Sequence, residues 1–462
     1  MAGSSVVIAS NRGPLSFSLD RDGKPSSSRG GGGLVSAMSV AAAQDDAVWI
    51  CAALSDVDRS VATSSPRGRI DLAGHDTGGA AVRMLAVDES VLAGAYTSIA
   101  NSTLWPINHG LIDTMPTYDD RWLADWDRYV EYNAAFAQAI AESAADDARV
   151  LVQDYHLDLV PAQLRAMRPD LRIAHFTHTP WATAEDFARL PGDAARRLVE
   201  GLAGADSIGF HSPRWAANFA ACAAATGVTV TAPLRVHPLG VDPVPLLARA
   251  AERDVAERAG VLRAAVDGRR VIGRVDRTEP AKNIHRGLLA FAELLRQRPE
   301  HVDAVVHVAL AYPSRQDVAE YRDYTSDCVA LAAEINGEFA DAARPPVLFE
   351  VRDDYPRSLA TLGCADVLLV NSLRDGMNLV AKEGVLLSPD VALVLSRETG
   401  AADEMPDALL VDPLDVEATA DALHEALALS GAERAERHRR LAAAAAALPP
   451  HAWLQQQLDV LS

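Results

Sequence analysis

The chain has 462 residues, of which 49% are hydrophobic and 23% are charged, a composition typical of a globular protein long enough for two domains. Its net charge is −20, from 63 acidic and 43 basic residues, and a surface of that sign repels nucleic acid and anionic membranes. An anionic ligand would therefore need basic residues gathered at one place on the protein.

The four cysteines, Cys51, Cys222, Cys328 and Cys364, form no C-x-x-C pair, and each lies among apolar or small residues. We interpret them as reduced thiols in a core rather than as a disulfide framework or a zinc site. The chain starts without a basic segment before a long apolar one, and no apolar run approaches the ~20 residues that span a membrane. These features predict a soluble cytoplasmic protein.

Short apolar runs alternate with helical patterns along most of the chain. The expected strands are 6–9, 149–153, 172–177, 207–210, 271–275, 305–311, 367–370 and 391–395. The expected helices include 126–145, 194–203 and 284–298. Strand followed by helix, repeated, predicts an α/β fold with parallel sheets covered on both faces.

Two prolines and a glycine interrupt both patterns at residues 236–243, which marks a domain boundary. We expect an N-terminal domain over 1–236, a second domain over 237–440, and a helical segment over 441–462 that packs back on the domains. Two doubly wound domains predict a ligand cleft between them, at the carboxyl ends of their strands.

Arg277 and Lys282 follow an expected strand and precede an expected helix. A guanidinium, an ammonium group and the amides and dipole of a helix N-terminus together suit a diphosphate. Basic residues are also common near surface turns, so these two residues alone leave both readings open.

Residues 374–383 read R-D-G-M-N-L-V-A-K-E between an apolar strand and a helix. Gly376 lets the backbone approach a ligand closely. Asp375 can accept two sugar hydroxyls, and Glu383 can hold a ribose diol. The purely structural alternative is an aspartate N-cap followed by a glycine in the first turn, which does not explain the charged pair between a buried strand and a buried helix.

In the first half, Arg12 follows the first strand, and the glycines of 30–33 precede a helix. A Gly-rich loop can cradle a phosphate or sugar, although flexible loops have the same composition. Tyr96, Trp105 and Arg315 offer, together with Arg12, the hydroxyl, indole and guanidinium groups that would hold a sugar phosphate.

Asp154 and His178 end consecutive strands and can face the cleft, although a lone histidine at a strand end is more often structural. The sequence has no serine or cysteine elbow, no H-E-x-x-H motif, no Walker sequence and no G-x-G-x-x-G fingerprint. These absences disfavour hydrolase, metalloenzyme, kinase, ATPase and dehydrogenase functions. We expect neither a metal nor a cofactor.

Together these residues resemble the trehalose-6-phosphate synthase family, which are retaining glycosyltransferases of the GT-B fold. The matching stretches keep the family's order and spacing over almost the whole chain, and the 374–383 motif is very specific. The stretches are 10–12, 32–34, 104–106, 154–157, 178–180, Arg277 with Lys282, 313–318, 335–337 and 374–383.

The resemblance implies transfer of glucose from a nucleotide-diphosphate glucose to glucose 6-phosphate, giving α,α-trehalose 6-phosphate by a front-face mechanism. For the donor, it assigns Arg277 and Lys282 to the diphosphate, Glu383 to the ribose, and Gly33 to a place beside the phosphate and glucose. The transferred glucose is assigned to Asp375, to the side chain of His178, and to the backbone of Gly376, Met377, Asn378 and Leu379. Val380, in the same stretch, is also assigned to the donor. It assigns to the acceptor Arg12, Tyr96, Trp105 and Arg315 at the phosphate and Asp154 at the hydroxyls.

The chain departs from the family pattern at Trp181 and Ala182, where Phe and Pro are common, and has Glu279 as the acidic residue after Arg277. The 277–282 stretch also resembles the related pseudo-glycosyltransferases, which couple aminocyclitols through nitrogen. Arg12 and the full 374–383 motif favour the true glycosyltransferase. A catalytically silent sugar-phosphate sensor would not need Arg277, Lys282 and Asp375.

The donor base is expected near residues 350–358. A carboxylate from Asp353 or its neighbour Asp354 suits the paired donors of guanine, and Ser358 can reach another edge, so we predict GDP-glucose over UDP-glucose. The alternative is that both aspartates only cap the following helix. The expected partners are the two substrates, with no nucleic acid and no membrane, and a homo-oligomer stays open.

Overall fold

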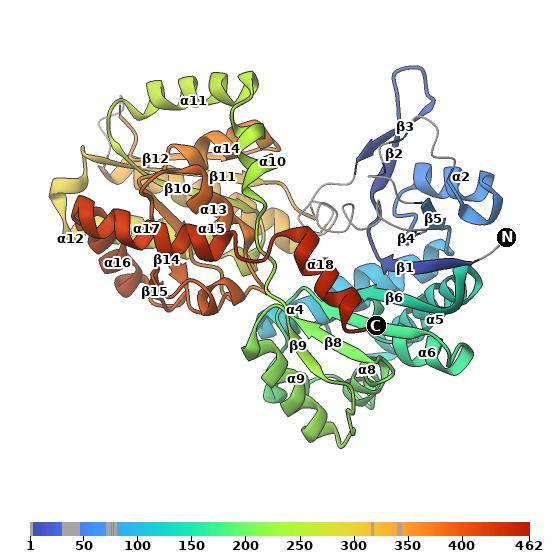
Figure 1. The fold of residues 1–462 in the computed structure, drawn as a ribbon. Coiled ribbons are helices and arrows are strands. Elements are labelled where there is room, and N and C mark those ends of the chain that lie inside the picture. The colour runs from blue at the N-terminus through green and yellow to red at the C-terminus, as the bar shows by residue number, and fades with distance from the viewer. Residues whose placement is uncertain are drawn as a thin grey trace. The chain divides into compact units, whose positions relative to one another are not determined.

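The computed structural model describes residues 3–29, 47–70, 75, 77, 81–315, 318–339 and 344–462. The chain forms two compact units (Figure 1), unit 1 from residues 1–238 with 450–462 and unit 2 from residues 239–449. From the sequence we expect the first boundary at residue 236 and the start of the terminal segment at 441. In the structure α17 (Gly431–Ala445) runs through residue 441, and the chain rejoins unit 1 only at Pro450.

Unit 1 is built on a sheet of parallel strands in the order β5-β4-β1-β6-β7-β8-β9. A short antiparallel hairpin, β2 with β3, follows the first strand. The strands are β1 (Ser4–Ser10), β2 (Leu15–Leu19), β3 (Pro25–Arg29), β4 (Ala47–Ala52), β5 (Ala81–Leu85), β6 (Ala144–Gln153), β7 (Arg172–Thr177), β8 (Ser207–Phe210) and β9 (Leu234–Val236).

The helices of unit 1 are α2 (Asp56–Ser64), α3 (Glu89–Leu92), the π-helix η2 (Ala93–Leu104), α4 (Trp105–His109), α5 (Asp120–Ser143), α6 (Val160–Met167), α7 (Ala184–Phe187), α8 (Ala194–Ala203), α9 (Pro213–Thr226) and α18 (Pro450–Asp459). The helix expected over 194–203 is confirmed as α8. α5 begins earlier than expected because the side chain of Asp119 caps it, and it ends earlier because β6 starts at Ala144.

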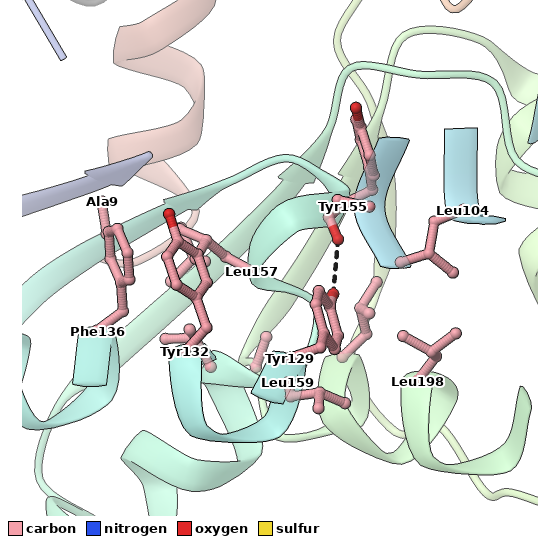
Figure 2. Packing of buried hydrophobic residues seen from close by; sticks show 14 of the residues in the cluster. Ala9, Leu104, Tyr129, Tyr132, Phe136, Tyr155, Leu157, Leu159 and Leu198 are labelled. Carbon is pink, nitrogen blue, oxygen red and sulfur yellow. Dashed lines mark hydrogen bonds between the residues drawn. The ribbon is translucent and has the colours of Figure 1, made fainter. Parts of the chain in front are cut away.

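The core of unit 1 depends on α5, whose buried positions recur every three or four residues, the spacing that places side chains on one face of a helix. These positions are Trp122, Trp126, Tyr129, Asn133, Phe136 and Ile140. Figure 2 shows part of this core, where the hydroxyl of Tyr129 donates to the carbonyl of Tyr155 at 2.7 Å. The bond satisfies a phenol that would be costly to bury unpaired.

Unit 2 has a second parallel sheet in the order β12-β11-β10-β13-β14-β15. The strands are β10 (Arg270–Arg277), β11 (Val305–Tyr312), β12 (Val347–Val351), β13 (Val367–Val370), β14 (Ala392–Ser396) and β15 (Leu409–Val411). In β13, Val367 and Leu369 pack into one hydrophobic cluster, and Leu368 and Val370 pack into another. A strand buried on both faces needs a continuous apolar run, which is the pattern that identified β13 in the sequence.

The helices of unit 2 are α10 (Pro243–Ala250), α11 (Arg253–Val266), α12 (Ile284–Gln297), α13 (Ala319–Phe339), α14 (Tyr355–Gly363), α15 (Leu379–Leu387), α16 (Val416–Ala428) and α17. Figure 1 shows them around the sheet, which confirms the predicted pair of doubly wound parallel-sheet domains. In the described ranges, no helix combines the length and apolarity needed to cross a membrane.

Replacement of two glycines by alanine should have opposite effects on the free energy of unfolding. A Cβ on Gly201 of α8 would lie 2.3 Å from the carbonyl oxygen of Asp158, whereas a Cβ on Gly260 of α11 would meet no atom within 4 Å. Gly201→Ala should therefore lower the free energy of unfolding by roughly 1–3 kcal/mol. Gly260→Ala should raise it by roughly 0.5–1 kcal/mol. Chemical denaturation followed by circular dichroism measures both, and equal effects of the two changes would contradict this packing.

Candidate active site

Several of the residues expected at the site follow the central strands of each sheet. In unit 1, β1 and β6 are neighbours where the strand order reverses. Asp154 comes directly after β6, and Arg12 comes two residues after the end of β1. In unit 2, β10 and β13 hold the corresponding place, with Arg277 ending β10 and residues 374–383 following β13. Doubly wound sheets bind ligands at the carboxyl ends of strands at this point.

Lys282 and Asp375 are brought together at that edge of unit 2. The Nζ of Lys282 lies 2.5 Å from Oδ2 of Asp375, which also accepts a hydrogen bond from the side chain of Asn378 at 3.1 Å. Burial lowers the pKa of Lys282, but the carboxylates of Asp375 and Asp276 outweigh it and raise the pKa above its ordinary value. The ammonium group is therefore charged at neutral pH and held by one fixed partner.

A buried ion pair lies behind Lys282. The guanidinium of Arg274 is 1% exposed, and it lies 2.9 Å from Asp276 and also donates to the side chain of Asn371 and the carbonyl of Lys282. Burial raises the pKa of Asp276 despite the nearby Arg274. By holding the carbonyl of Lys282, Arg274 fixes the turn η5 (Pro280–Lys282) that presents the lysine.

The N-terminus of α12 differs from the sequence expectation. The hydroxyl of Tyr324 accepts the amide hydrogens of Ile284 at 2.7 Å and of His285 at 3.4 Å. These two amides are thus used inside the protein and are not available to a diphosphate. The N-terminus of α12 still presents its positive dipole end.

The 374–383 motif forms a loop and the first turn of α15. Its N-cap is Asn378, whose side chain accepts from the amide of Ala381 at 3.1 Å, so the alternative that Asp375 is the cap is wrong. The first-turn amides of Leu379 and Val380 have no acceptor within the helix. Gly400 supports the loop, since a Cβ there would lie 2.0 Å from the carbonyl oxygen of Gly376.

The two charged residues that end the motif have different environments. Lys382 is fully buried, and its Nζ donates to the carbonyl of Leu239 at 2.9 Å and to Glu404 at 2.5 Å. It anchors the first residue of unit 2 and has no part exposed to a ligand. Glu383 has no hydrogen-bond or ion-pair partner among the described residues, and burial raises its pKa to about 7.

Arg277 is paired with a buried glutamate. Its guanidinium lies 2.7 Å from Oε1 of Glu279, which is fully buried and also accepts from the hydroxyl of Ser314 at 2.6 Å. Burial would raise the pKa of Glu279, but the charges of Arg277, Arg315 and Lys282 hold it below its ordinary value. Arg315 itself has a positive φ of 45° and donates to the hydroxyl of Tyr321 at 2.5 Å.

The other residues expected to hold the acceptor phosphate belong to unit 1. Arg12 is exposed and reaches the hydroxyl of Tyr96 at 3.4 Å. Trp105 is 9% exposed and stacks on His109 with ring centroids 3.8 Å apart. The structure thus brings Arg12 and Tyr96 together, packs most of Trp105 into the core, and places Arg315 in unit 2 beside the Arg277 group.

Asp154 and His178 are linked in unit 1. The backbone amide of His178 donates to Asp154 at 3.0 Å, and Asp154 has a positive φ of 73°. Burial raises the pKa of Asp154 to about 6, so the carboxyl is ionised at neutral pH. The ring of His178 bonds at one nitrogen to Gln153 and at the other to His211.

The sequence profile of glycosyltransferase family 20 matches residues 4–462. The chain belongs to glycosyltransferase family 20. It is 36% identical over 485 residues to a trehalose-6-phosphate synthase of Mycobacterium sp. (strain JLS), covering 99% of this chain and 96% of that protein. It is 37% identical over 483 residues to one of Mycolicibacterium gilvum (strain PYR-GCK), covering 99% and 93%.

Solved structures agree with this family assignment. A trehalose-6-phosphate protein from E. coli bound with UDP-2-fluoro glucose matches with a TM-score of 0.86 and 27% identity, covering 99% of this chain and 98% of that one. A UDP-forming α,α-trehalose-phosphate synthase from Burkholderia xenovorans in complex with glucose-6-phosphate matches with a TM-score of 0.83 and 28% identity, covering 99% of each. The expected resemblance to the trehalose-6-phosphate synthase family and its GT-B fold is confirmed.

In this member of family 20, the three residues expected near the donor base have different contacts. Asp354 caps α14 by accepting from the amide of Arg357 at 3.0 Å, and its carboxylate lies 3.1 Å from the guanidinium of Arg258. Asp353 is exposed and has no hydrogen-bond or ion-pair partner among the described residues. Ser358 is buried and bonds to the hydroxyl of Tyr312.

Gly33 and the rest of the Gly-rich loop lie outside the described residues. Several residues that shape the site were not singled out from the sequence, namely Arg274, Asp276, Tyr324, Gly400 and Glu404. Tyr324, Gly400 and Glu404 act on residues more than twenty positions away along the chain, whereas Arg274 and Asp276 lie within β10, close to Lys282. Glu279 was noted in the sequence because it lies two residues after Arg277, and that spacing is consistent with its contact to Arg277.

One group among the described residues has metal-ligand chemistry. Ligand atoms of Glu300, His301 and His424 lie within 4.8 Å of one another. Nε2 of His301 and Nδ1 of His424 are 3.0 Å apart, so the two imidazoles already satisfy each other. Glu300 and His301 lie between the end of α12 and the start of β11, away from the carboxyl ends of the strands, and His424 lies in α16.

The raised pKa of Glu383 makes the stability of unit 2 depend on pH. Because its pKa in the folded protein, about 7, lies above its ordinary value of 4.5, folding favours the protonated form. That stability is fully present below about pH 4.5 and is lost as the pH rises through 7. Glu383→Gln should therefore leave the free energy of unfolding nearly unchanged at pH 4.5 and raise it at pH 8 by up to about 3 kcal/mol.

Denaturant unfolding at the two pH values measures the difference. The matched control is Glu425→Gln, at an exposed glutamate of α16, which should give the same small effect at both. A difference for Glu383→Gln that does not change with pH would contradict the burial of an unpaired carboxyl.

Proposed function

We propose that this glycosyltransferase moves glucose from a nucleotide-diphosphate glucose to glucose 6-phosphate and forms α,α-trehalose 6-phosphate. The observation that carries the proposal is the Lys282–Asp375 pair beside Arg277 at the carboxyl ends of β10 and β13. It joins a charged phosphate-binding group to a sugar-binding carboxylate in one place. Relatives named trehalose-6-phosphate synthases that match nearly the whole chain support the same reaction.

In this proposal the donor lies along unit 2. Arg277 and Lys282 bind the diphosphate, and Glu383 binds the ribose. The carboxylate of Asp375, with the backbone of residues 376–380, accepts and donates hydrogen bonds to the transferred glucose. His178 of unit 1 contributes a further contact to that glucose. The unpartnered carboxyl of Glu383 and the first-turn amides of α15 support this assignment, since both have hydrogen-bonding capacity left for a ligand.

Retention follows from a front-face mechanism. The bond between C1 of glucose and the oxygen of the β-phosphate breaks, and the anomeric hydroxyl of glucose 6-phosphate forms the new bond on the same face. Its proton passes to the departing phosphate. Asp375 is held by Lys282 and Asn378, which suits a fixed sugar-binding group better than a free nucleophile. Arg277 and Lys282 stabilise the charge that grows on the phosphate as it leaves.

The acceptor is held by its phosphate and by its hydroxyls. Arg12, Tyr96 and Trp105, together with Arg315 of unit 2, bind the phosphate, and the ionised carboxylate of Asp154 accepts hydrogen bonds from the sugar. The contact between Arg12 and Tyr96 supports a joint role for these two residues.

Two other functions are tested against this one. A pseudo-glycosyltransferase would couple a nucleotide-cyclitol to an aminocyclitol phosphate, and a silent sensor would bind without turnover. The intact pairing of Lys282 with Asp375 favours glucose transfer. Nucleotide release from the sugar nucleotide, measured with and without glucose 6-phosphate, separates all three.

We also propose a cytoplasmic location, supported by four cysteines that are all free thiols.

For the donor base we propose GDP-glucose over UDP-glucose, with Asp353 as the residue that recognises guanine. Asp354 is committed to the cap of α14, so the preference rests on its neighbour. Burial, and to a smaller degree the charges of Asp353 and Asp354, raise the pKa of Tyr312 to about 12, which places Asp353 near the Tyr312–Ser358 pair. Ser358 then orders this group rather than contacting the base itself.

Removal of the phosphate-binding charge should abolish most of the transfer. We expect Lys282→Met to cost about 2 to 4 kcal/mol of transition-state stabilisation, seen as a loss in kcat/KM for the donor. Arg253→Ala, at an exposed arginine of α11, is the control and should keep full activity. Near-native turnover by Lys282→Met, or equal use of free glucose and glucose 6-phosphate by the native protein, would refute the proposed site.

The base preference predicts a second measurement. The native protein should show a higher kcat/KM with GDP-glucose than with ADP- or UDP-glucose. Asp353→Asn should narrow that preference by about tenfold or more, because a site built to hydrogen-bond one group discriminates strongly against ligands lacking it. Asp354→Asn keeps a helix cap and should leave the preference unchanged. UDP-glucose as the best native donor would show that Asp353 does not read the base.

A further inference from the structure

Helix α18 packs against the ring of His178 in unit 1. Trp453 of α18 is fully buried, with its ring centroid 4.9 Å from that of Phe176 and 5.5 Å from that of His178. Its indole N–H donates to the carbonyl of His237 at 2.8 Å. The aromatic contact packs one side of the His178 ring against α18.

A line of amides also connects α18 to that ring. Gln457 is 2% exposed, and its Oε1 lies 3.3 Å from Nε2 of Gln153, which is fully buried. Oε1 of Gln153 is 2.9 Å from Nε2 of His178. On the other side, Nδ1 of His178 is 3.1 Å from Nε2 of His211, whose Nδ1 is 3.3 Å from the carbonyl oxygen of His237.

The positions of the protons follow from the carbonyl group of His237, which ends this series of hydrogen bonds. Burial, with His211 and His175 adding to it, holds the pKa of His178 well below its ordinary value, so the ring is neutral and carries one N–H. A carbonyl only accepts, so a bond from His211 to His237 needs the proton on Nδ1 of His211. Its Nε2 then accepts from Nδ1–H of His178, and Nε2 of His178 accepts from the amide of Gln153.

This arrangement requires a half-turn of both glutamine amides relative to the contacts above. The oxygen and nitrogen of an amide exchange places on a half-turn with almost no change of shape. When Gln153 donates to His178, its oxygen faces Gln457, whose Nε2 can donate to it. In the opposite orientation Nε2 of Gln457 is buried without a hydrogen-bond partner. The half-turn places Oε1 there instead, and a buried acceptor without a partner is less costly than a buried N–H without one.

We propose that Gln457 is a positioning residue which, through Gln153, holds His178 in its Nδ1–H tautomer and fixes the orientation of its ring. The backbone of His178 is fixed separately, by its amide bond to Asp154. The effect on catalysis rests on the proposed function, in which His178 contacts the transferred glucose. The tautomer itself does not depend on it.

The tautomer can be measured directly in the full-length protein. Long-range 1H–15N correlation spectra of the histidine rings should show a protonated Nδ1 and an unprotonated Nε2 for His178, with the signals assigned by their loss in His178→Asn. Gln457→Met keeps the volume and burial of the side chain but removes the amide. It should give a mixture of both tautomers, because Gln153 is then free to turn.

Activity gives the second readout. Gln457→Met should lower kcat about tenfold, the effect of one mispaired hydrogen bond, with the KM for glucose 6-phosphate within about twofold of native. Gln455→Met is the matched control, since Gln455 is exposed on the same helix and bonds only to Asp459 among the described residues. It should match the native protein in both spectra and rates.

The outcomes separate this proposal from the proposed function. An Nε2–H tautomer in the native protein, or a native tautomer retained in folded Gln457→Met, overturns the positioning role whether or not glucose is transferred. Absence of transfer with an Nδ1–H tautomer that depends on Gln457 refutes the function and keeps the positioning. If Gln457→Met does not fold, Gln457→Leu replaces it and the native spectrum still decides the tautomer.

Discussion

The ion pair between Lys282 and Asp375 joins two residues that are 93 positions apart in the sequence. It links two segments at the carboxyl ends of the strands of unit 2, because Lys282 follows β10 and Asp375 follows β13. Both side chains are mostly buried, and removal of one charge would leave the other unpaired in a poorly solvated place. The turn before α12 and the loop before α15 are therefore fixed with respect to each other.

The same principle extends outward from that pair. Arg274 and Asp276 form a buried layer behind Lys282, and Glu279 forms another beside Arg277. Each cation that we assign to the donor phosphate thus has a carboxylate partner within unit 2. Arginine and lysine side chains lose much conformational entropy when they bind a ligand, and this loss is smaller where neighbouring charges already hold them. Such preorganisation is what a transition state with a growing phosphate charge requires.

The sequence predicted what depends on local pattern. Apolar runs such as 367–370 identified the buried strands, and the 374–383 motif identified the loop that follows one of them. Contacts between distant residues escaped prediction. Tyr324 occupies the amides of α12 from another helix, and nothing near Ile284 reveals this. Asp354 could be read as a cap or as a base contact, and its guanidinium partner Arg258, 96 residues away, was not visible. Arg12 and Arg315 are both assigned to the acceptor phosphate, and the sequence did not reveal that they belong to different units.

Unit 1 is discontinuous, since residues 1–238 are completed by 450–462. During synthesis, the sheet of unit 1 leaves the ribosome about 200 residues before the helix that covers His178. At the usual elongation rate that interval lasts roughly 10 to 40 seconds. Throughout it Phe176 and His178 lack the indole of Trp453 that packs against them in the finished chain. The aromatic side chains of Phe176 and His178 are therefore available to chaperones or to incorrect contacts until α18 has been synthesised and packs against them.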